Sequence, residues 1–169
     1  TVNSQLLSDL STGLREFFTQ KSLTEKDPDL LAADLTVEIK THNVEKTLSD
    51  RLAYLIFNAI FTINIHKQLK DHGKLYLIML NKFNVPNQPL ETLMNVEYLL
   101  LAKNKDPKVH AFISTIMNML YEDKLLTDEL LLKWEEGKEE SILKHFLYDK
   151  ERDDAFKVHS REFLNWLKE

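Results

Sequence analysis

The chain has 169 residues, no cysteine, a formal net charge of −5 and a pI near 5.7. The absence of cysteine excludes disulfides, cysteine-ligated zinc, iron–sulfur clusters and thiol catalysis, and the acidic balance argues against a nucleic-acid binder, which is usually basic. No apolar run is long enough to span a bilayer, which takes about 20 residues, and no charged-then-apolar leader opens the sequence. We therefore expect a single cytoplasmic domain over residues 1–169, taken from a longer chain, with no membrane partner.

The first half of the chain has apolar residues at the i, i+3, i+4 spacing of amphipathic helices. This spacing predicts a first helix over 6–18. Asp27 and Pro28 then mark a helix start, because an aspartate can cap a helix and proline fits its first position, and a second apolar stripe follows over 31–39. The segment 44–65 is predicted to be the longest apolar helix, with neighbours on more than one side.

Helical spacing continues to the end of the chain, with start and stop signals between the helices. Asp106 and Pro107 repeat the earlier start signal, Thr127 can cap a short helix, and Gly137 can end that helix in a left-handed conformation. About nine helices joined by short connections predict an all-α array of antiparallel helix pairs. The other helical segments of this half are predicted over 75–83, 88–102, 109–120, 142–147 and 156–167.

Residue types that carry catalysis are present, but they do not form a catalytic pattern. The six histidines are spread over the chain, and no two stand at the helical spacing of a metal-binding pair. Three scattered glycines cannot form a phosphate-binding loop. The pairs Glu135/Glu136 and Glu139/Glu140 could serve as catalytic carboxylates, but acids beside lysines are more often a solvated face. We predict no enzymatic activity, no cofactor and no metal site.

The negative charge is concentrated in one segment. Between Tyr121 and Glu140 eight acids stand against three bases, so this segment alone has a net charge of −5. Trp134 and Trp166 each end an apolar helical stripe. Either the two rings anchor the core, as large aromatic side chains usually do, or their edges also line a docking surface, since a buried ring can hold a helix that displays acids to solvent.

Two aromatic and acidic segments resemble the boxes of a known family. Residues 120–134 (LYEDKLLTDELLLKW) resemble the first aromatic and acidic box of the W2 domain, and residues 163–169 (FLNWLKE) resemble the second. W2 domains occur in translation initiation factor 5, in the epsilon subunit of initiation factor 2B and in factor 4G-type scaffolds. Upstream, residues 55–59 and 65–72 are most similar to the factor 5 branch of the family.

The resemblance implies an atypical HEAT-type helical array without catalysis of its own. It also implies partners, namely lysine-rich segments of the initiation factor 2 beta subunit together with initiation factors 3 and 1, which assemble in the translation pre-initiation complex. The aromatic and acidic residues expected to bind these partners are Tyr121, Glu122, Asp123, Asp128, Glu129, Trp134, Glu135, Glu136, Glu139, Glu140, Glu162, Trp166 and Glu169.

A second charged patch is basic. Its residues are His66, Lys67, Lys70, His72 and Lys74. These side chains are either solvated on a helix surface or form a separate site for an acidic partner, which would let the domain bridge two proteins.

Three other functions stay open at the level of sequence. Within the same family, the chain could be the C-terminal domain of the initiation factor 2B epsilon subunit, which supports guanine-nucleotide exchange on factor 2; stimulation of GDP release by this chain alone would favour that alternative. An enzyme that uses the glutamate pairs would need a deep apolar pocket beside a perturbed carboxylate. A structural repeat fragment whose acids bind nothing is the third alternative.

Overall fold

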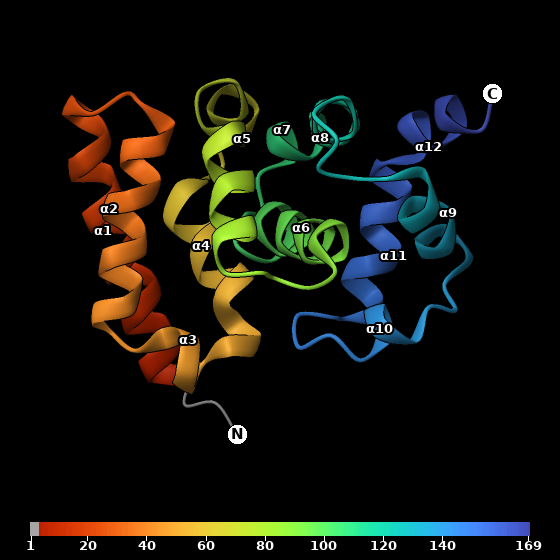
Figure 1. Cartoon of the computed structure of the whole chain (residues 1–169). Helices are drawn as coiled ribbons and strands as arrows, with labels where there is room; N and C mark the ends of the chain where they lie inside the picture. The colour runs from red at the N-terminus through yellow and green to blue at the C-terminus, as the bar shows by residue number, and fades with distance from the viewer. Residues whose placement is uncertain (1–3) are drawn as a thin grey trace. The chain divides into compact units, whose positions relative to one another are not determined.

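The computed structural model describes residues 4–169, and the regular secondary structure of this part of the chain is entirely helical, without a strand (Figure 1). The all-α prediction is therefore confirmed, whereas the HEAT-type arrangement stays a prediction. None of the described helices combines the length and the apolarity that crossing a bilayer requires. The elements are α1 (Ser4–Thr24), α2 (Pro28–Thr41), α3 (Val44–Thr47), the 3₁₀ turn η1 (Ser49–Arg51), α4 (Leu52–Ile60), α5 (Ile65–Lys82), α6 (Gln88–Glu97), the π-helical turn η2 (Tyr98–Ala102), α7 (Pro107–His110), α8 (Ile113–Glu122), α9 (Asp128–Glu136), α10 (Glu140–Leu143), α11 (Lys150–His159) and α12 (Arg161–Leu167).

The chain forms two compact units. Unit 1 takes in the chain up to Thr62 together with Lys70–Pro86, and unit 2 takes in Ile63–Leu69 together with Asn87–Glu169. Helix α5 therefore contributes residues 65–69 to unit 2 and the rest of its length to unit 1.

Unit 1 is built around α1, which packs against α2 and α4. Helices α1 and α2 lie side by side as an antiparallel pair (Figure 1). The predicted start of α2 is confirmed, because the Asp27 carboxylate accepts a hydrogen bond from the backbone N–H of Asp29 at 2.9 Å and Pro28 occupies the first helical position. The predicted apolar stripe over 31–39 is buried.

The prediction of one continuous helix over 44–65 is wrong. The structure divides this segment into α3, η1 and α4, because Leu48 leaves the helical conformation at φ −135° and Phe61 is extended at φ −110° and ψ 142°. The Phe61 ring is fully buried, with its centroid 5.1 Å from that of Phe57 and 5.4 Å from that of Tyr76. Packing of this ring in the core, which apolar spacing does not register, accompanies the end of α4.

In unit 2, three predicted helix ends are confirmed. The Thr127 hydroxyl accepts a hydrogen bond from the N–H of Leu130 at 3.3 Å and caps α9, and Gly137 ends that helix at φ +75°. The Asp106 carboxylate accepts from the N–H of Lys108 at 2.9 Å and caps α7.

The predicted stripe over 109–120 is interrupted. Helix α7 ends at His110 and α8 begins at Ile113, and the Phe112 side chain between them is 48% exposed. Its ring stacks on that of His66, with the centroids 5.5 Å apart and an interplanar angle of 5°. The prediction that Phe112 belongs to a buried stripe is therefore wrong, although the apolar face of α8 itself is buried.

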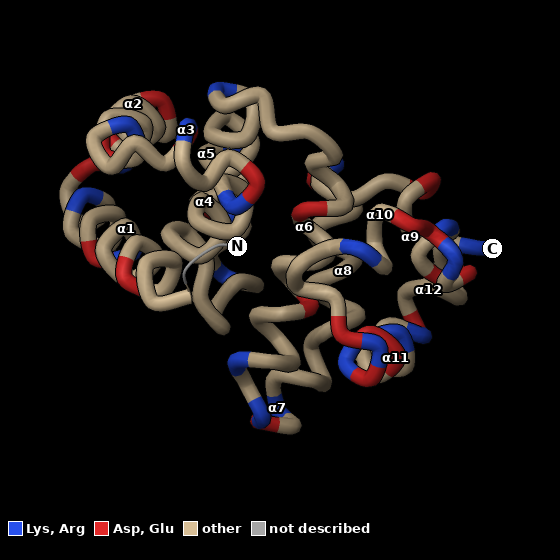
Figure 2. Tube along the Cα trace, turned by 90° about the horizontal axis from the view of Figure 1, so that it is seen from below, with Lys and Arg blue, Asp and Glu red and all other residues tan. Residues whose placement is uncertain are grey.

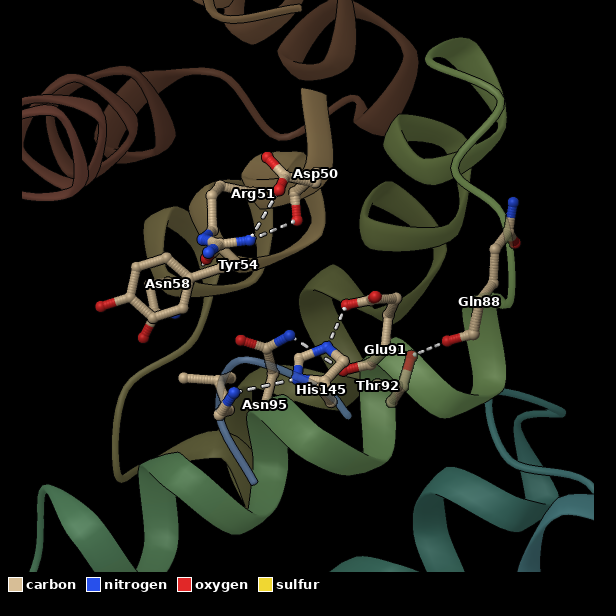
Figure 3. Close-up of polar contacts among 10 residues, drawn as sticks. Asp50, Arg51, Tyr54, Asn58, Gln88, Glu91, Thr92, Asn95 and His145 are labelled. Atoms are coloured by element: carbon tan, nitrogen blue, oxygen red, sulfur yellow. Dashed lines mark hydrogen bonds and ion pairs between the residues drawn. The ribbon is translucent and has the colours of Figure 1, made fainter. Parts of the chain in front are cut away.

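His145, whose side chain is 7% exposed, connects the segment before α11 to α6. His145 Nε2 lies 3.0 Å from a carboxylate oxygen of Glu91, toward which the ring points (Figure 3). The backbone N–H of Leu147 donates to His145 Nδ1 at 3.1 Å. Because Nδ1 accepts this hydrogen bond, Nε2 carries a ring proton and donates to Glu91.

Candidate partner-binding surface

Packing of α12 against α8 brings the two aromatic and acidic segments of the sequence together. The Tyr121 ring centroid lies 5.9 Å from that of Phe163 and 5.8 Å from that of Trp166, and the rings of Phe163 and Trp166 are 6.0 Å apart. Aromatic pairs at such distances add favourable ring–ring interactions to their apolar contact. Phe163 is buried, whereas Trp166 is 47% exposed. The three rings therefore form a cluster that fixes Trp166 while leaving much of it open to solvent.

A hollow of about 370 Å³ lies beside this cluster, between α8 and α12. Thr115, Asn118 and Glu122 are spaced i, i+3, i+7 on α8, and Glu162 and Trp166 are spaced i, i+4 on α12, so each set shares one helix face. The lining contains two carboxylates and no basic residue. We call it the α8–α12 hollow, and its lining residues are Ser114, Thr115, Asn118, Glu122, Glu162, Phe163 and Trp166.

Two basic residues, one at the start of α12 and one just after it, form ion pairs with Glu135 and not with the acids of the hollow. The Arg161 guanidinium and the Lys168 ammonium lie 2.8 Å and 3.0 Å from the same carboxylate oxygen of Glu135. This oxygen atom holds both cations, and the Glu135 side chain is only 19% exposed. Glu135 is thus occupied within the protein, and no cation of α12 lines the α8–α12 hollow.

Trp134 occupies a different environment from Trp166. It is 1% exposed, and its indole N–H donates to a carboxylate oxygen of Asp153 at 2.8 Å. The other Asp153 oxygen lies 3.2 Å from the Lys157 ammonium, which is also 5.7 Å from the centroid of the Trp134 ring. The interpretation of Trp134 as a core anchor is confirmed, and a partner cannot reach this ring in the folded structure. Trp166 is 47% exposed, and its role in docking stays a prediction.

A second acid, Glu97 of α6, is buried near Asp153. Burial, with the neighbouring Asp153 carboxylate adding to it, raises the pKa of Glu97 to about 10. The cations of Arg152 and Lys157 oppose this shift only in part. Glu97 is therefore a neutral carboxylic acid at neutral pH. Its burial puts it out of reach of substrates and partners, so its perturbed pKa is a property of the core.

The remaining acids of the predicted site fall into two groups. Glu129 and Glu140 form exposed ion pairs with Lys133 and Lys144, at 3.2 Å and 2.8 Å, and such pairs can be replaced by a competing cation. Figure 2 shows acidic and basic positions close together along α9 and α11. The predicted acids that form no ion pair with any residue in the described part of the chain are Glu122, Asp123, Asp128, Glu136, Glu139, Glu162 and Glu169.

Tyr121 joins the ring cluster to one of these acids. A hydrogen bond to Asp128, whose negative charge adds a smaller effect, raises the pKa of the Tyr121 hydroxyl above its usual value. The phenol thus stays a donor at neutral pH.

No family model, curated protein or solved structure matches the chain. Membership of the W2 family therefore stays a prediction, and the case for a function depends on the geometry of the surface just described.

The predicted basic patch follows helix α5. Its two histidines pack on aromatic rings: His66 stacks on Phe112, and the His72 ring lies edge-on to Phe18 at 5.1 Å. Burial lowers the pKa of His72, so this ring adds little positive charge at neutral pH. The exposed positive charge comes from lysines at i, i+3, i+7 positions of α5, namely Lys67, Lys70 and Lys74.

A second hollow and a pair of histidines do not indicate a particular ligand. A hollow of about 690 Å³ in unit 1 has two lysines and two acids in its lining, so it favours neither sign of ligand charge. His110 and His159 have ring centroids 5.0 Å apart, but no group of three or more histidine, aspartate and glutamate side chains among residues 4–169 could hold a metal ion.

The polar side chains that line the α8–α12 hollow are not evident from the sequence. Thr115 and Asn118 carry no charge or aromatic ring that would mark them, although their spacing from Glu122 places all three on one face of a helix. Asp153, the partner of Trp134, is not evident from the sequence either, because nothing in a run of charged residues distinguishes the one that is buried.

Proposed function

We propose that unit 2 is a non-enzymatic protein-interaction module that binds lysine-rich segments of partner proteins. The observation that supports this best is the α8–α12 hollow, where the exposed Trp166 and the carboxylates of Glu122 and Glu162 line one surface without a basic residue. The positive charges of a lysine-rich segment can interact with the two carboxylates, and the alkyl part of a lysine side chain can pack against the Trp166 ring.

The physics of such a surface favours collective binding. A single exposed ion pair contributes little, so one glutamate would not hold a partner. Several carboxylates without ion pairs act together on a run of lysines, raise the association rate and select for the sign of charge. A flexible lysine-rich segment loses conformational entropy when it binds, which makes the affinity of each segment modest. Repeated lysine segments would offset this through their effective concentration.

The sequence resemblance extends the proposal to a biological setting. The segments 120–134 and 163–169 resemble the two boxes of the W2 domain, and the ring cluster joins residues from both. On this basis the chain acts in translation initiation, as the C-terminal domain of initiation factor 5. Its partners are then the lysine-rich tail of the initiation factor 2 beta subunit and initiation factors 3 and 1.

Titration calorimetry with a lysine-rich peptide tests the proposed function. The double variant Glu122→Gln/Glu162→Gln should bind the peptide about tenfold more weakly than the wild type, because two charges of the hollow are lost. Raising the salt concentration should weaken binding to the wild type more than to the variant, since screening acts on the charges that the variant lacks.

A matched control removes two charges elsewhere. Glu16 and Glu151 are exposed on α1 and α11 and do not line the α8–α12 hollow. The variant Glu16→Gln/Glu151→Gln has the same net charge as the test variant and should bind almost as well as the wild type. Equal losses in both double variants would show a general charge effect and remove the hollow as the binding site.

A further inference from the structure

We infer that the α8–α12 hollow holds the guanidinium group of an arginine in the bound basic segment, while the lysines of that segment lie along the surrounding acids. This inference depends on the proposed function and specifies the residue that the hollow selects.

The lining of the hollow offers hydrogen-bond acceptors at several positions. Glu122 on α8 and Glu162 on α12 contribute two carboxylates, and Asn118 and Thr115 contribute an amide oxygen and a hydroxyl. Ser114 is already engaged, because its hydroxyl donates to the His159 carbonyl at 3.1 Å and accepts from the Phe163 N–H at 3.4 Å. Acceptors on two helices suit a planar group that donates in several directions at once.

The aromatic wall points to the same ligand. Trp166 is 47% exposed, and the rings of Tyr121 and Phe163 support it from the protein side. Arginine stacks on aromatic rings more often than lysine does, and tryptophan is the most favourable ring for a cation. A hollow of about 370 Å³ is at the small end of ligand sites, so it suits one side chain.

Lysine matches this lining less well. Its ammonium is a compact, strongly hydrated charge with three donors, whereas guanidinium is planar, more weakly hydrated and has five N–H donors in a fixed fork. An ammonium placed over Trp166 would keep most of its water and reach fewer of the acceptors. The protein's own cations nearby do not fill the hollow, because Arg161 of α12 and Lys168, which follows that helix, are held by Glu135.

The test compares peptides of equal length and charge. One peptide contains only lysine as its basic residue, and a second series carries a single Lys→Arg replacement moved through the sequence. At one position or more, the arginine peptide should bind wild-type protein about 3- to 10-fold more tightly than the lysine peptide, as expected for one additional cation–aromatic contact. Replacement of that arginine by citrulline, which keeps the shape but removes the charge, should reverse the gain.

Two variants locate the effect. Trp166→Leu and Glu162→Gln change side chains that are exposed, so both proteins should fold, and both should bind the arginine and lysine peptides equally. The control Glu151→Gln should keep the preference for arginine. If the lysine peptide binds wild type and no arginine peptide binds more tightly, the inference is wrong and the proposed function stands. If neither kind of peptide binds, both are wrong.

Discussion

The indole N–H of Trp134 donates to the carboxylate of Asp153 at 2.8 Å, and both side chains are buried. The same carboxylate is 3.2 Å from the ammonium of Lys157, whose side chain is only 14% exposed. Asp153 of α11 therefore accepts the N–H of Trp134 on α9 and neutralises Lys157. These contacts connect α9, which carries several of the acidic residues, to the core of unit 2.

Removal of this acid should destabilise the protein strongly. In Asp153→Ala the Trp134 N–H and the Lys157 ammonium lose their partner while still buried, and breaking a buried pair in this way costs about 3–5 kcal/mol of unfolding free energy. Urea denaturation measures the effect. Asp154→Ala, at the exposed neighbouring position, removes only a surface pair with Lys150 and should leave the unfolding midpoint almost unchanged.

Glu97 should make stability depend on pH. Its pKa is raised to about 10 in the folded protein, whereas the unfolded chain ionises near the ordinary value of 4.5. The folded state therefore keeps a proton that the unfolded state releases, so the contribution of Glu97 is fully present below pH 4.5 and is lost as pH rises toward 10. The stability of Glu97→Gln relative to wild type should increase over this range, by up to roughly 1.4 kcal/mol per pH unit.

Denaturation of both proteins at several pH values between 5 and 9 measures this trend. Glu151→Gln, an exposed change on α11, provides the control and should differ from wild type by a constant amount. A constant difference for Glu97→Gln as well would mean that Glu97 is already ionised in the folded protein.

Two glycines should respond in opposite directions to alanine. Gly137 ends α9 at φ +75°, a conformation in which a Cβ is strained, so Gly137→Ala should cost about 1–2 kcal/mol. Gly13 lies within α1, and a Cβ there would meet nothing within 4 Å. Gly13→Ala should stabilise the protein by about 0.5–1 kcal/mol through helix propensity. Thermal unfolding of the two variants gives the signs directly, and the same sign for both would contradict the conformations described.

His145 should protect one particular amide. Its Nδ1 accepts the Leu147 N–H, and its Nε2 donates to Glu91. His145→Ala removes both partners, so the Leu147 amide should exchange with deuterium at least about tenfold faster, and Glu91 is left largely buried without its donor. The exposed His42, which pairs with Glu38 on the surface, offers His42→Ala as a control that should not change this rate. Unchanged protection of Leu147 in His145→Ala would show that the histidine does not hold this segment.

Local signals predicted the helix ends well. The start at Asp27, the cap at Thr127 and the stop at Gly137 depend only on neighbouring residues, and each has the predicted geometry. The break within 44–65 depends on the burial of Phe61 against Phe57 and Tyr76, and Tyr76 lies on another helix. Apolar periodicity contains no information about such a contact, so it predicted a longer helix.

The candidate site was predicted in its composition but not in its arrangement. The sequence indicated that Tyr121, Glu122 and Trp166 belong to aromatic and acidic segments, but it could not show that α8 packs on α12 and joins them. It also could not show that Glu135 is occupied by Arg161 and Lys168, since those partners are 26 and 33 residues away. Ion pairs between residues far apart in the sequence depend on tertiary packing, and a count of charges along the sequence gives no information about that packing.

A cationic segment that binds in the α8–α12 hollow should contact Trp166 and leave the buried Trp134 unaffected. The chain has two tryptophans, so its NMR spectrum should contain two indole N–H signals, one from each environment. On titration with a lysine-rich peptide, the Trp166 signal should shift progressively until saturation, and the Trp134 signal should stay in place. If a bound peptide shifts the Trp134 signal, or neither signal, the α8–α12 hollow is not the binding site.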